Sequence, residues 1–255
     1  MEDQGIKALM ETMNKLLSPE GCPWDREQTH TSLRRYLVEE TYEVLAAIDD
    51  GDMNELREEL GDLLLQIVFH SALAEREGAF NLSDVANIVN EKMINRHPHV
   101  FGHLEINSSD EVMQHWEGFK RDEGKKSILE GIPRHLPALL RAYKLQEKAA
   151  RVGFDWPQVQ GALKKLNEET AEFIAASQDG SPEMIEEEMG DILFTIVNIA
   201  RMSGIEPEQA LQNSNAKFTR RFNHIESRLN DEGQLLEEAG LEKLDKLWDE
   251  AKANE

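Results

Sequence analysis

Cysteine, aromatic residues and long apolar runs are all scarce in this chain of 255 residues. Cys22 is the single cysteine, so no disulfide can form within the chain and nothing indicates an oxidising compartment. The longest apolar run, Leu63 to Phe69, is interrupted by Gln66 and is far too short to span a membrane. The first residues lack the basic segment and apolar run of a signal peptide. We therefore expect a cytoplasmic protein with no membrane partner.

Positive charge is also scarce. The chain has 28 lysines and arginines against 50 acidic residues, a net charge of −22. This balance argues against binding a nucleic-acid polymer through a basic surface, but a small anionic substrate fits if metal ions and a few local cations hold it. Aromatic residues make up only 6% and prolines number eight, which favours helices. The length suffices for one large or two small domains.

One pattern of acidic residues occurs twice. The first group is Glu39, Glu40, Glu43, Glu59 and Asp62, and the second is Glu168, Glu169, Glu172, Glu188 and Asp191. Every member of the second group lies 129 residues after its counterpart, as Glu168 does after Glu39. The members mirror each other about Gly51 and Gly180. A glycine turn between two helices would make the helices antiparallel and bring four carboxylates of each group to face one another.

Helix phase distinguishes the acids within each group. An apolar stripe runs along the first acidic helix through Leu33, Leu37, Thr41, Val44 and Ile48. At about 100° per residue, Glu40 falls on the edge of this stripe and Glu39 points further out. Clustered carboxylates beside a core repel strongly unless protons or divalent cations neutralise them. An all-carboxylate ligand set suits Mg²⁺, with Mn²⁺ as the alternative.

The repeat extends beyond the acids. LGDLLLQIV is echoed by MGDILFTIV, and Trp116 and Lys120 are echoed by Trp248 and Lys252. We predict an all-α fold, a tandem duplication of a helical-bundle domain, with domains at 1–122 and 137–255 and a linker at 123–136. Within the first domain we expect a helix over residues 6–17, a loop over 21–30, and Thr31 or Ser32 as the N-cap of the acidic helix.

Two other interpretations of the acids remain. An exposed helix face with lysine or arginine partners explains a single group, but few cations lie at the required spacing in either copy. A di-iron bundle would need Glu-x-x-His on two helices, and the sequence has it only at Glu27 to His30, in or near a loop. Both are weaker than the divalent-metal interpretation.

A group of cations follows each acid pair. Lys217, Arg220 and Arg221 share one helix, and their first-half counterparts are Lys92, Asn95 and Arg96. Such a group would bind phosphate oxygens, or form salt bridges to neighbouring acidic helices. Further candidates are Lys165, as a phosphate contact or a solvated lysine, and Trp248, as a base-stacking ring or a packing residue.

These motifs resemble the two-domain MazG nucleoside triphosphate pyrophosphohydrolases. The resemblance rests on GCPWD, QTH, EETYE, ELGDLL and RHPHVF in the first half, and on VGFDW, EETAE, EEMGDILF and KFTRRF in the second. It implies a dimer, Mg²⁺ dependence, and hydrolysis of nucleoside triphosphates to the monophosphate and pyrophosphate. It also implies metal binding by Glu169, Glu172, Glu188 and Asp191, and triphosphate binding by the lysine and arginines of the following helix.

The functional prediction assigns a role to each residue. Glu168, Glu169 and Glu172 are catalytic, and the substrate contacts are Lys165, Glu168, Lys217, Arg220, Arg221 and Trp248. A second site would comprise Glu39, Glu40, Glu43, Glu59, Asp62, Lys92 and Arg96, ranked lower because Asn95 stands where the second half has Arg220. We expect broad base specificity and a role in nucleotide-pool housekeeping or stress regulation. The alternative is a non-catalytic nucleotide-sensing or protein-binding module, and the sequence identifies no protein partner.

Overall fold

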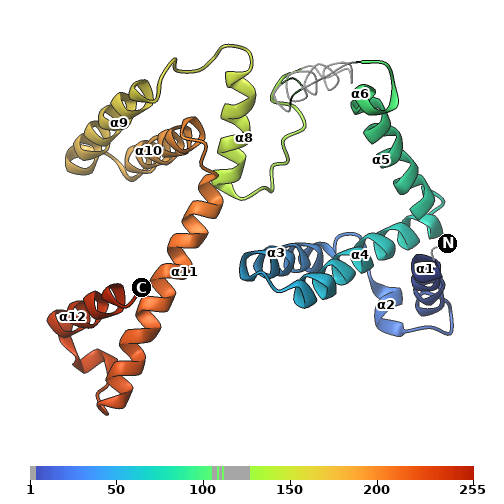
Figure 1. The fold of residues 1–255 in the computed structure, drawn as a ribbon, viewed down its shortest axis with the longest axis horizontal. Coiled ribbons are helices and arrows are strands. Elements are labelled where there is room, and N and C mark those ends of the chain that lie inside the picture. Colours follow the sequence, from blue (N-terminus) through green and yellow to red (C-terminus); the bar gives the residue numbers. More distant parts are fainter. Residues whose placement is uncertain (1–3, 105–107, 109–110, 112–126) are drawn as a thin grey trace. The chain divides into compact units, whose positions relative to one another are not determined.

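The computed structural model describes residues 4–104, 108, 111 and 127–255, and these residues form helices and connecting turns without a strand (Figure 1). They divide into two compact units, Met1–Glu123 and Gly124–Glu255. The prediction of an all-α fold is therefore confirmed. Among the described residues, no helix is both long and apolar enough to cross a membrane.

The first unit is built around one long helix. Its elements are α1 (Gln4–Leu16), α2 (Pro23–Glu27), α3 (Arg34–Asp50), α4 (Met53–Arg76), α5 (Leu82–Arg96) and α6 (Pro98–Phe101). Helix α4 packs against α1, α3 and α5. The buried core lies where α1 and the start of α3 meet the second half of α4, around Met13, Leu33, Val68 and Phe69.

A tight turn sets α3 and α4 side by side. Gly51 ends α3 in the left-handed region at φ 70°, which glycine adopts without a steric penalty. Asp52 then caps α4, since its carboxylate accepts hydrogen bonds from the backbone N–H groups of Asn54 and Glu55. The chain therefore reverses within two residues, which brings the acids of the two helices together.

The start of α3 differs from the prediction in two ways. The predicted loop contains the short helix α2, which begins at Pro23, where a fixed φ suits the first helical position. Neither Thr31 nor Ser32 caps α3, which begins at Arg34 after a helical Leu33 with no side-chain cap. Instead, the Ser32 hydroxyl donates to the Gln28 side chain and accepts from the Thr29 N–H, so it stabilises the preceding turn.

The second unit repeats the central helix pair. Its elements are α8 (Ala138–Ala150), α9 (Val159–Asp179), α10 (Pro182–Met202), α11 (Pro207–Asp231), the 3₁₀ helix η1 (Leu236–Glu238) and α12 (Gly240–Ala253). Helices α9 and α10 pack closely, as α3 and α4 do (Figure 1). Gly180 is extended at φ −85°, unlike Gly51, and Ser181 caps α10. A second core forms between α11 and α12 around Ile225, Leu229 and Leu247.

Parts of the predicted domain boundary cannot be compared with the fold. Trp116 and Lys120 of the repeat lie outside the described residues, as do residues 123–126 of the predicted linker. Residues 127–136 form bends and turns.

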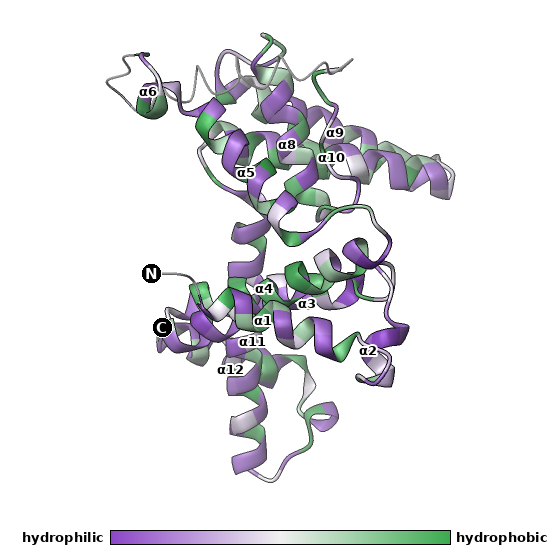
Figure 2. Cartoon of the chain, turned by 90° about the vertical axis from the view of Figure 1, so that its right-hand side faces the viewer, coloured by the Kyte–Doolittle hydropathy of each residue, from purple (hydrophilic) through white to green (hydrophobic). Residues whose placement is uncertain are grey.

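The helices are amphipathic, and their ribbons carry both hydrophilic and hydrophobic stretches (Figure 2). Much of the apolar surface of the two hairpins is nevertheless exposed. Leu60 and Ile67 on α4 are 49% and 40% exposed, and Met189 and Ile196 on α10 are 40% and 45% exposed. Among the described residues, each hairpin thus leaves one apolar face partly exposed.

The α11–α12 core predicts the cost of a single truncation. Leu229 is 1% exposed between Ile225 and Leu247, so Leu229→Ala should lower the free energy of unfolding of the second unit by about 2–5 kcal/mol. Leu241→Ala is the control, because Leu241 is 82% exposed and should change stability by about 0.5 kcal/mol at most. Urea denaturation followed by circular dichroism measures both. Equal destabilisation by the two variants would contradict this packing.

Candidate active site

Each helix hairpin brings three carboxylates together. In the first unit these are Glu40, Glu43 and Glu59, from α3 and α4, and in the second they are Glu169, Glu172 and Glu188, from α9 and α10. In each group, one oxygen from every residue lies within 4.8 Å of the others. Asp62 and Asp191, one turn beyond Glu59 and Glu188, are not among these close oxygens.

The second group contains a cation of its own. Lys165, one turn before the acids on α9, donates to Glu168 Oε1 at 2.6 Å and lies 2.7 Å from Glu169 Oε1. These two carboxylates raise the pKa of Lys165, so the lysine stays charged. Glu169 is only 4% exposed, whereas Glu168 is exposed, as helix phase predicts. The hydrogen bond to Glu169, together with burial, raises the pKa of Glu172.

The first group has no equivalent lysine. Tyr36 stands where the repeat places Lys165. Burial raises the pKa of Glu40, and the charges of Asp62 and Glu43 raise it further. The pKa of Glu59 is raised in the same way, by burial and then by Glu43 and Asp62. This group is therefore short of positive charge.

Glu59 provides the strongest sign that a ligand belongs here. Its Oε2 is buried and has no hydrogen-bond partner among the described residues. A buried carboxylate oxygen without a donor is costly, and a divalent cation would satisfy it. Carboxylate oxygens converging from two helices also form the hard-ligand set that Mg²⁺ and Mn²⁺ prefer. The residues present therefore fit a divalent metal ion.

Gln66 is a residue near the site to which sequence reasoning assigned no role. It is 7% exposed, and its side-chain amide donates to Glu40 Oε1 at 3.5 Å. Thr195, its counterpart 129 residues later, is also buried. The sequence feature that could have identified Gln66 is its position as a polar side chain within the apolar run of α4.

The predicted phosphate-binding cations gather elsewhere in the second unit. Arg221 donates through Nη2 and Nε to Glu255 Oε2, at 2.6 and 3.2 Å, and its guanidinium lies 5.3 Å from the Trp248 ring centroid. Arg220 Nη2 lies 3.7 Å from Glu255 Oε1. Lys217 is exposed on the same helix. The ion-pair partners of these arginines thus lie beyond α12, at the end of the chain, and not on α9 or α10.

Helix direction explains this separation. The acids lie in the half of the α9–α10 hairpin nearer its turn, and α11 begins after the far end of α10. In both views α11 and α12 extend away from the hairpin (Figures 1 and 2). The first unit has the same order, with Lys92 and Arg96 on α5, after the far end of α4. Among the described residues, Arg220 and Arg221 thus pair with Glu255 and not with the carboxylates of α9 and α10.

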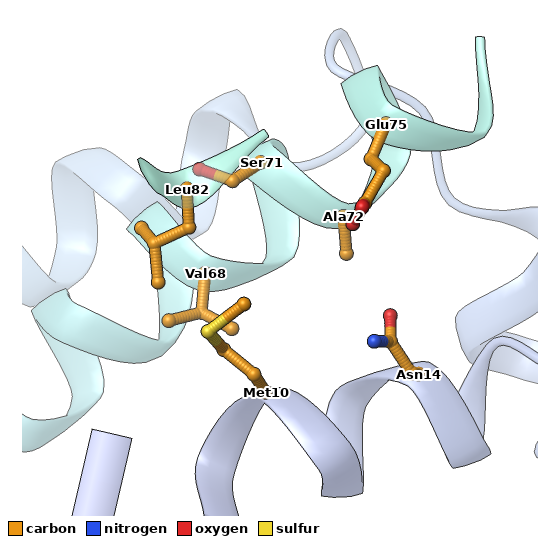
Figure 3. A pocket seen from close by; sticks show the side chains of 7 residues that line it. All are labelled: Met10, Asn14, Val68, Ser71, Ala72, Glu75 and Leu82. Carbon is orange, nitrogen blue, oxygen red and sulfur yellow. The ribbon is translucent and has the colours of Figure 1, made fainter. Parts of the chain in front are cut away.

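A pocket between α1 and α4 is not a nucleotide site. Its lining combines apolar side chains with a few polar ones: Met10, Asn14, Val68, Ser71, Ala72, Glu75 and Leu82 (Figure 3). Its volume of about 10 Å³ is close to that needed for one water molecule. The carboxylate groups are the candidate site.

The chain is similar to known proteins. Residues 28–101 and 158–226 match the model of the MazG nucleotide pyrophosphohydrolase domain, so the domain occurs twice. The nucleoside triphosphate pyrophosphohydrolase/pyrophosphatase MazG of Thermotoga maritima is 45% identical over 100% of this chain and 99% of its own length. The nucleoside triphosphate pyrophosphohydrolase of Escherichia coli K12 is 42% identical over 98% of each chain. A crystal structure of a mazG-related protein from Thermotoga maritima matches with a TM-score of 0.40 and 30% identity, over 45% of this chain and 98% of that one.

The two carboxylate groups differ in positive charge, so the same Glu→Gln substitution at matched positions should change stability by different amounts. In metal-free protein at pH 7, Glu59→Gln should raise the thermal midpoint more than Glu188→Gln. The first removes a charge from a group without a lysine, and the second removes one from a group that Lys165 already neutralises in part. Differential scanning fluorimetry with a chelator measures both.

The same comparison has a pH dependence. Because the folded-state pKa of Glu59 is raised, wild-type stability associated with this group is present at low pH and is lost as pH rises through that pKa. The gain from Glu59→Gln should therefore shrink as pH falls from 7 towards 5. A gain that is independent of pH, or equal for both variants, would contradict the charge argument.

Proposed function

The chain belongs to the MazG family of nucleotide pyrophosphohydrolases, and from this premise we propose that it hydrolyses nucleoside triphosphates to the monophosphate and pyrophosphate. One observation carries the proposal at the level of residues. The chain holds two groups of three converging carboxylates, and a buried oxygen of one group has no partner among the described residues.

The acids would hold the metal ion. Glu169, Glu172 and Glu188 supply the converging oxygens, and Asp191 is close enough in sequence to join them after a change of rotamer. A bound Mg²⁺ would polarise phosphate oxygens and lower the pKa of the attacking water. Mn²⁺ offers similar chemistry with the same ligands.

Glu168 and Lys165 would act beside these ligands. The Glu168 side chain is 59% exposed, so its carboxylate would accept a proton from water as the bond between the α- and β-phosphates breaks. Lys165 bridges Glu168 and Glu169. If a metal ion were bound by Glu169, Lys165 would keep its pairing with Glu168 and could also donate to a phosphate oxygen.

Lys217, Arg220, Arg221 and Trp248 would contact the substrate from the other side. Lysine and arginine stabilise charge that develops on phosphates, and arginine binds phosphate through two donors at once. These residues lie away from the acids of their own unit, so in a homodimer a second chain would supply one half of the site. We therefore include a homodimer in the proposal.

The exposed apolar faces support this assembly. Leu45 on α3, with Leu60 and Ile67 on α4, is exposed in the first unit, and Ile174, Met189 and Ile196 occupy the same repeat positions in the second. Apolar residues on one face of a two-helix hairpin are typical of half a four-helix bundle. A second copy of the chain carries the same faces and can cover them.

The second repeat is the better candidate for the active site. It combines all five acids with Lys165 and Arg220, whereas the first has Tyr36 and Asn95 at these positions. The first repeat would then be a weaker site or a scaffold. We also propose broad base specificity, since no strong base-reading motif occurs, and a role in nucleotide-pool housekeeping or stress regulation.

Activity measurements test the carboxylate mechanism. Glu172→Gln should lower kcat/KM for pyrophosphate release on the order of 100-fold, because loss of a metal ligand removes several kcal/mol of charge stabilisation. Glu43→Gln, at the matched position of the first repeat, is the control and should have a small effect. Removing divalent ions from the wild type should abolish release, and Mg²⁺ should restore it.

Three results would contradict parts of this proposal. Full activity in both single variants and in their combination would refute the carboxylate mechanism. Loss of activity with Glu43→Gln alone would reverse the ranking of the repeats. Nucleotide binding without turnover by the wild type would select the non-catalytic sensing module instead.

Sedimentation velocity tests the dimer. The wild type should sediment with twice the 29.1 kDa mass of one chain. Ile196→Glu should shift the population to monomers, because it introduces a charge into the apolar face of α10. Leu241→Glu is the control, since Leu241 is exposed on α12, outside that face. A monomeric wild type would refute this part of the proposal.

A further inference from the structure

Glu255 occupies the cation group that the proposed function assigns to phosphate. Its carboxylate accepts two hydrogen bonds from Arg221, at 2.6 and 3.2 Å, and lies 3.7 Å from Arg220 Nη2. These arginines, joined by the nearby charge of Lys217, hold the pKa of Glu255 below its usual range. A negatively charged oxygen group thus already sits among these three cations.

This contact uses the donors that a phosphate would need. Arginine binds phosphate through a pair of N–H groups, and Glu255 engages both Nη2 and Nε of Arg221. Arg221 cannot easily turn away, because its guanidinium lies over the Trp248 ring and its side chain is only 13% exposed. A phosphate and the Glu255 carboxylate therefore cannot both occupy this edge of Arg221.

The carboxylate can nevertheless leave. Glu255 lies two residues beyond the end of α12, and its side chain is 35% exposed. Helix α12 does not depend on it for attachment, because Leu247 packs against Ile225 and Leu229, and Glu250 lies 3.3 Å from Arg228 Nε. A change of the Glu255 side-chain rotamer, or movement of the residues after α12, would free the arginines and leave the helix pair intact.

We propose that Glu255 is an intramolecular competitor, which holds Arg220 and Arg221 until the phosphates of a nucleotide displace it. The inference rests on the proposed function, since it takes the same cations as the phosphate site. The contact is autoinhibitory, because the ion pairs between Glu255 and the two arginines must break before the arginines can bind the phosphates of the substrate. The same competition applies to the product pyrophosphate, which carries the same chemical groups.

A purely structural role for Glu255 predicts a different result. If Glu255 only fixes the orientation of Arg221, its removal should weaken phosphate binding and raise KM. If it only ties α12 to α11, its removal should lower stability and leave binding unchanged. Competition alone predicts tighter binding after the charge is removed.

Glu255→Gln tests this, with Glu250→Gln as the matched control. Both variants remove an acid that forms an ion pair with an arginine of α11. Glu255 pairs with Arg221, whereas Glu250 pairs with Arg228, which lies further along α11 and is not one of the proposed phosphate-binding cations. For Glu255→Gln we expect KM for a nucleoside triphosphate to fall about two- to fivefold with kcat little changed, the range that a partly exposed ion pair provides. The Kd for inorganic pyrophosphate, measured by titration calorimetry, should fall by a similar factor. Glu250→Gln should leave both constants at wild-type values.

The outcomes separate this inference from the proposed function. With an active wild type, an unchanged or raised KM in Glu255→Gln overturns the inference alone. An equal fall in Glu250→Gln also overturns it, because general loosening of α12 would then be the cause. If the wild type hydrolyses no nucleotide, the pyrophosphate titration decides: tighter binding by Glu255→Gln supports the competition, and unchanged binding refutes it.

Discussion

Crowding of like charges between two antiparallel helices is the constraint on which the rest of this structure depends. Both hairpins reverse within a residue or two and place three carboxylates within 4.8 Å of one another beside apolar side chains. Burial and mutual repulsion disfavour the ionised state there, as the raised pKa values of Glu40 and Glu59 indicate. The repeats differ in how they compensate, since Lys165 neutralises part of the charge of the second group, whereas Tyr36 stands at the matched position of the first, for which no ion pair occurs among the described residues. A metal ion is the compensation that both groups can share.

Local periodicity makes most of the fold predictable. The constant spacing of 129 residues identifies the duplication, and the helical period of 3.6 residues is enough to separate the buried Glu169 from the exposed Glu168. The symmetric spacing of the acids about a glycine locates the turns, since Gly51 or Gly180 lies midway between the paired acids. These features depend on residues that are close along the chain, where backbone geometry leaves few alternatives.

Features that depend on competing partners are not predictable in this way. Ser32 is a good N-cap by type, but its hydroxyl bonds within the preceding turn, and α3 begins without a side-chain cap. For Lys165 the sequence allows a phosphate contact or a solvated side chain, because it does not show that the lysine reaches Glu168 and Glu169 together. The pairing of Glu255 with Arg221 spans 34 residues and requires the packing of α11 against α12. Tertiary contacts determine which of the possible partners each of these side chains binds.

The carboxylates on the hairpin and the cations on α11 lie apart, and this separation relates the candidate site to the proposed homodimer. A helix hairpin can collect carboxylates because helix phase aligns them, but arginines placed opposite them would neutralise the charge available to a metal ion. Keeping the cations on α11 avoids that neutralisation, and Glu255 satisfies Arg220 and Arg221 there in the absence of substrate. On the proposed function, a metal-bound triphosphate is the ligand that bridges the two halves, because it presents a cation to the acids and anionic oxygens to the arginines. The exposed apolar faces of the hairpins then have a role beyond stability, since covering them by a second chain would bring the two halves together.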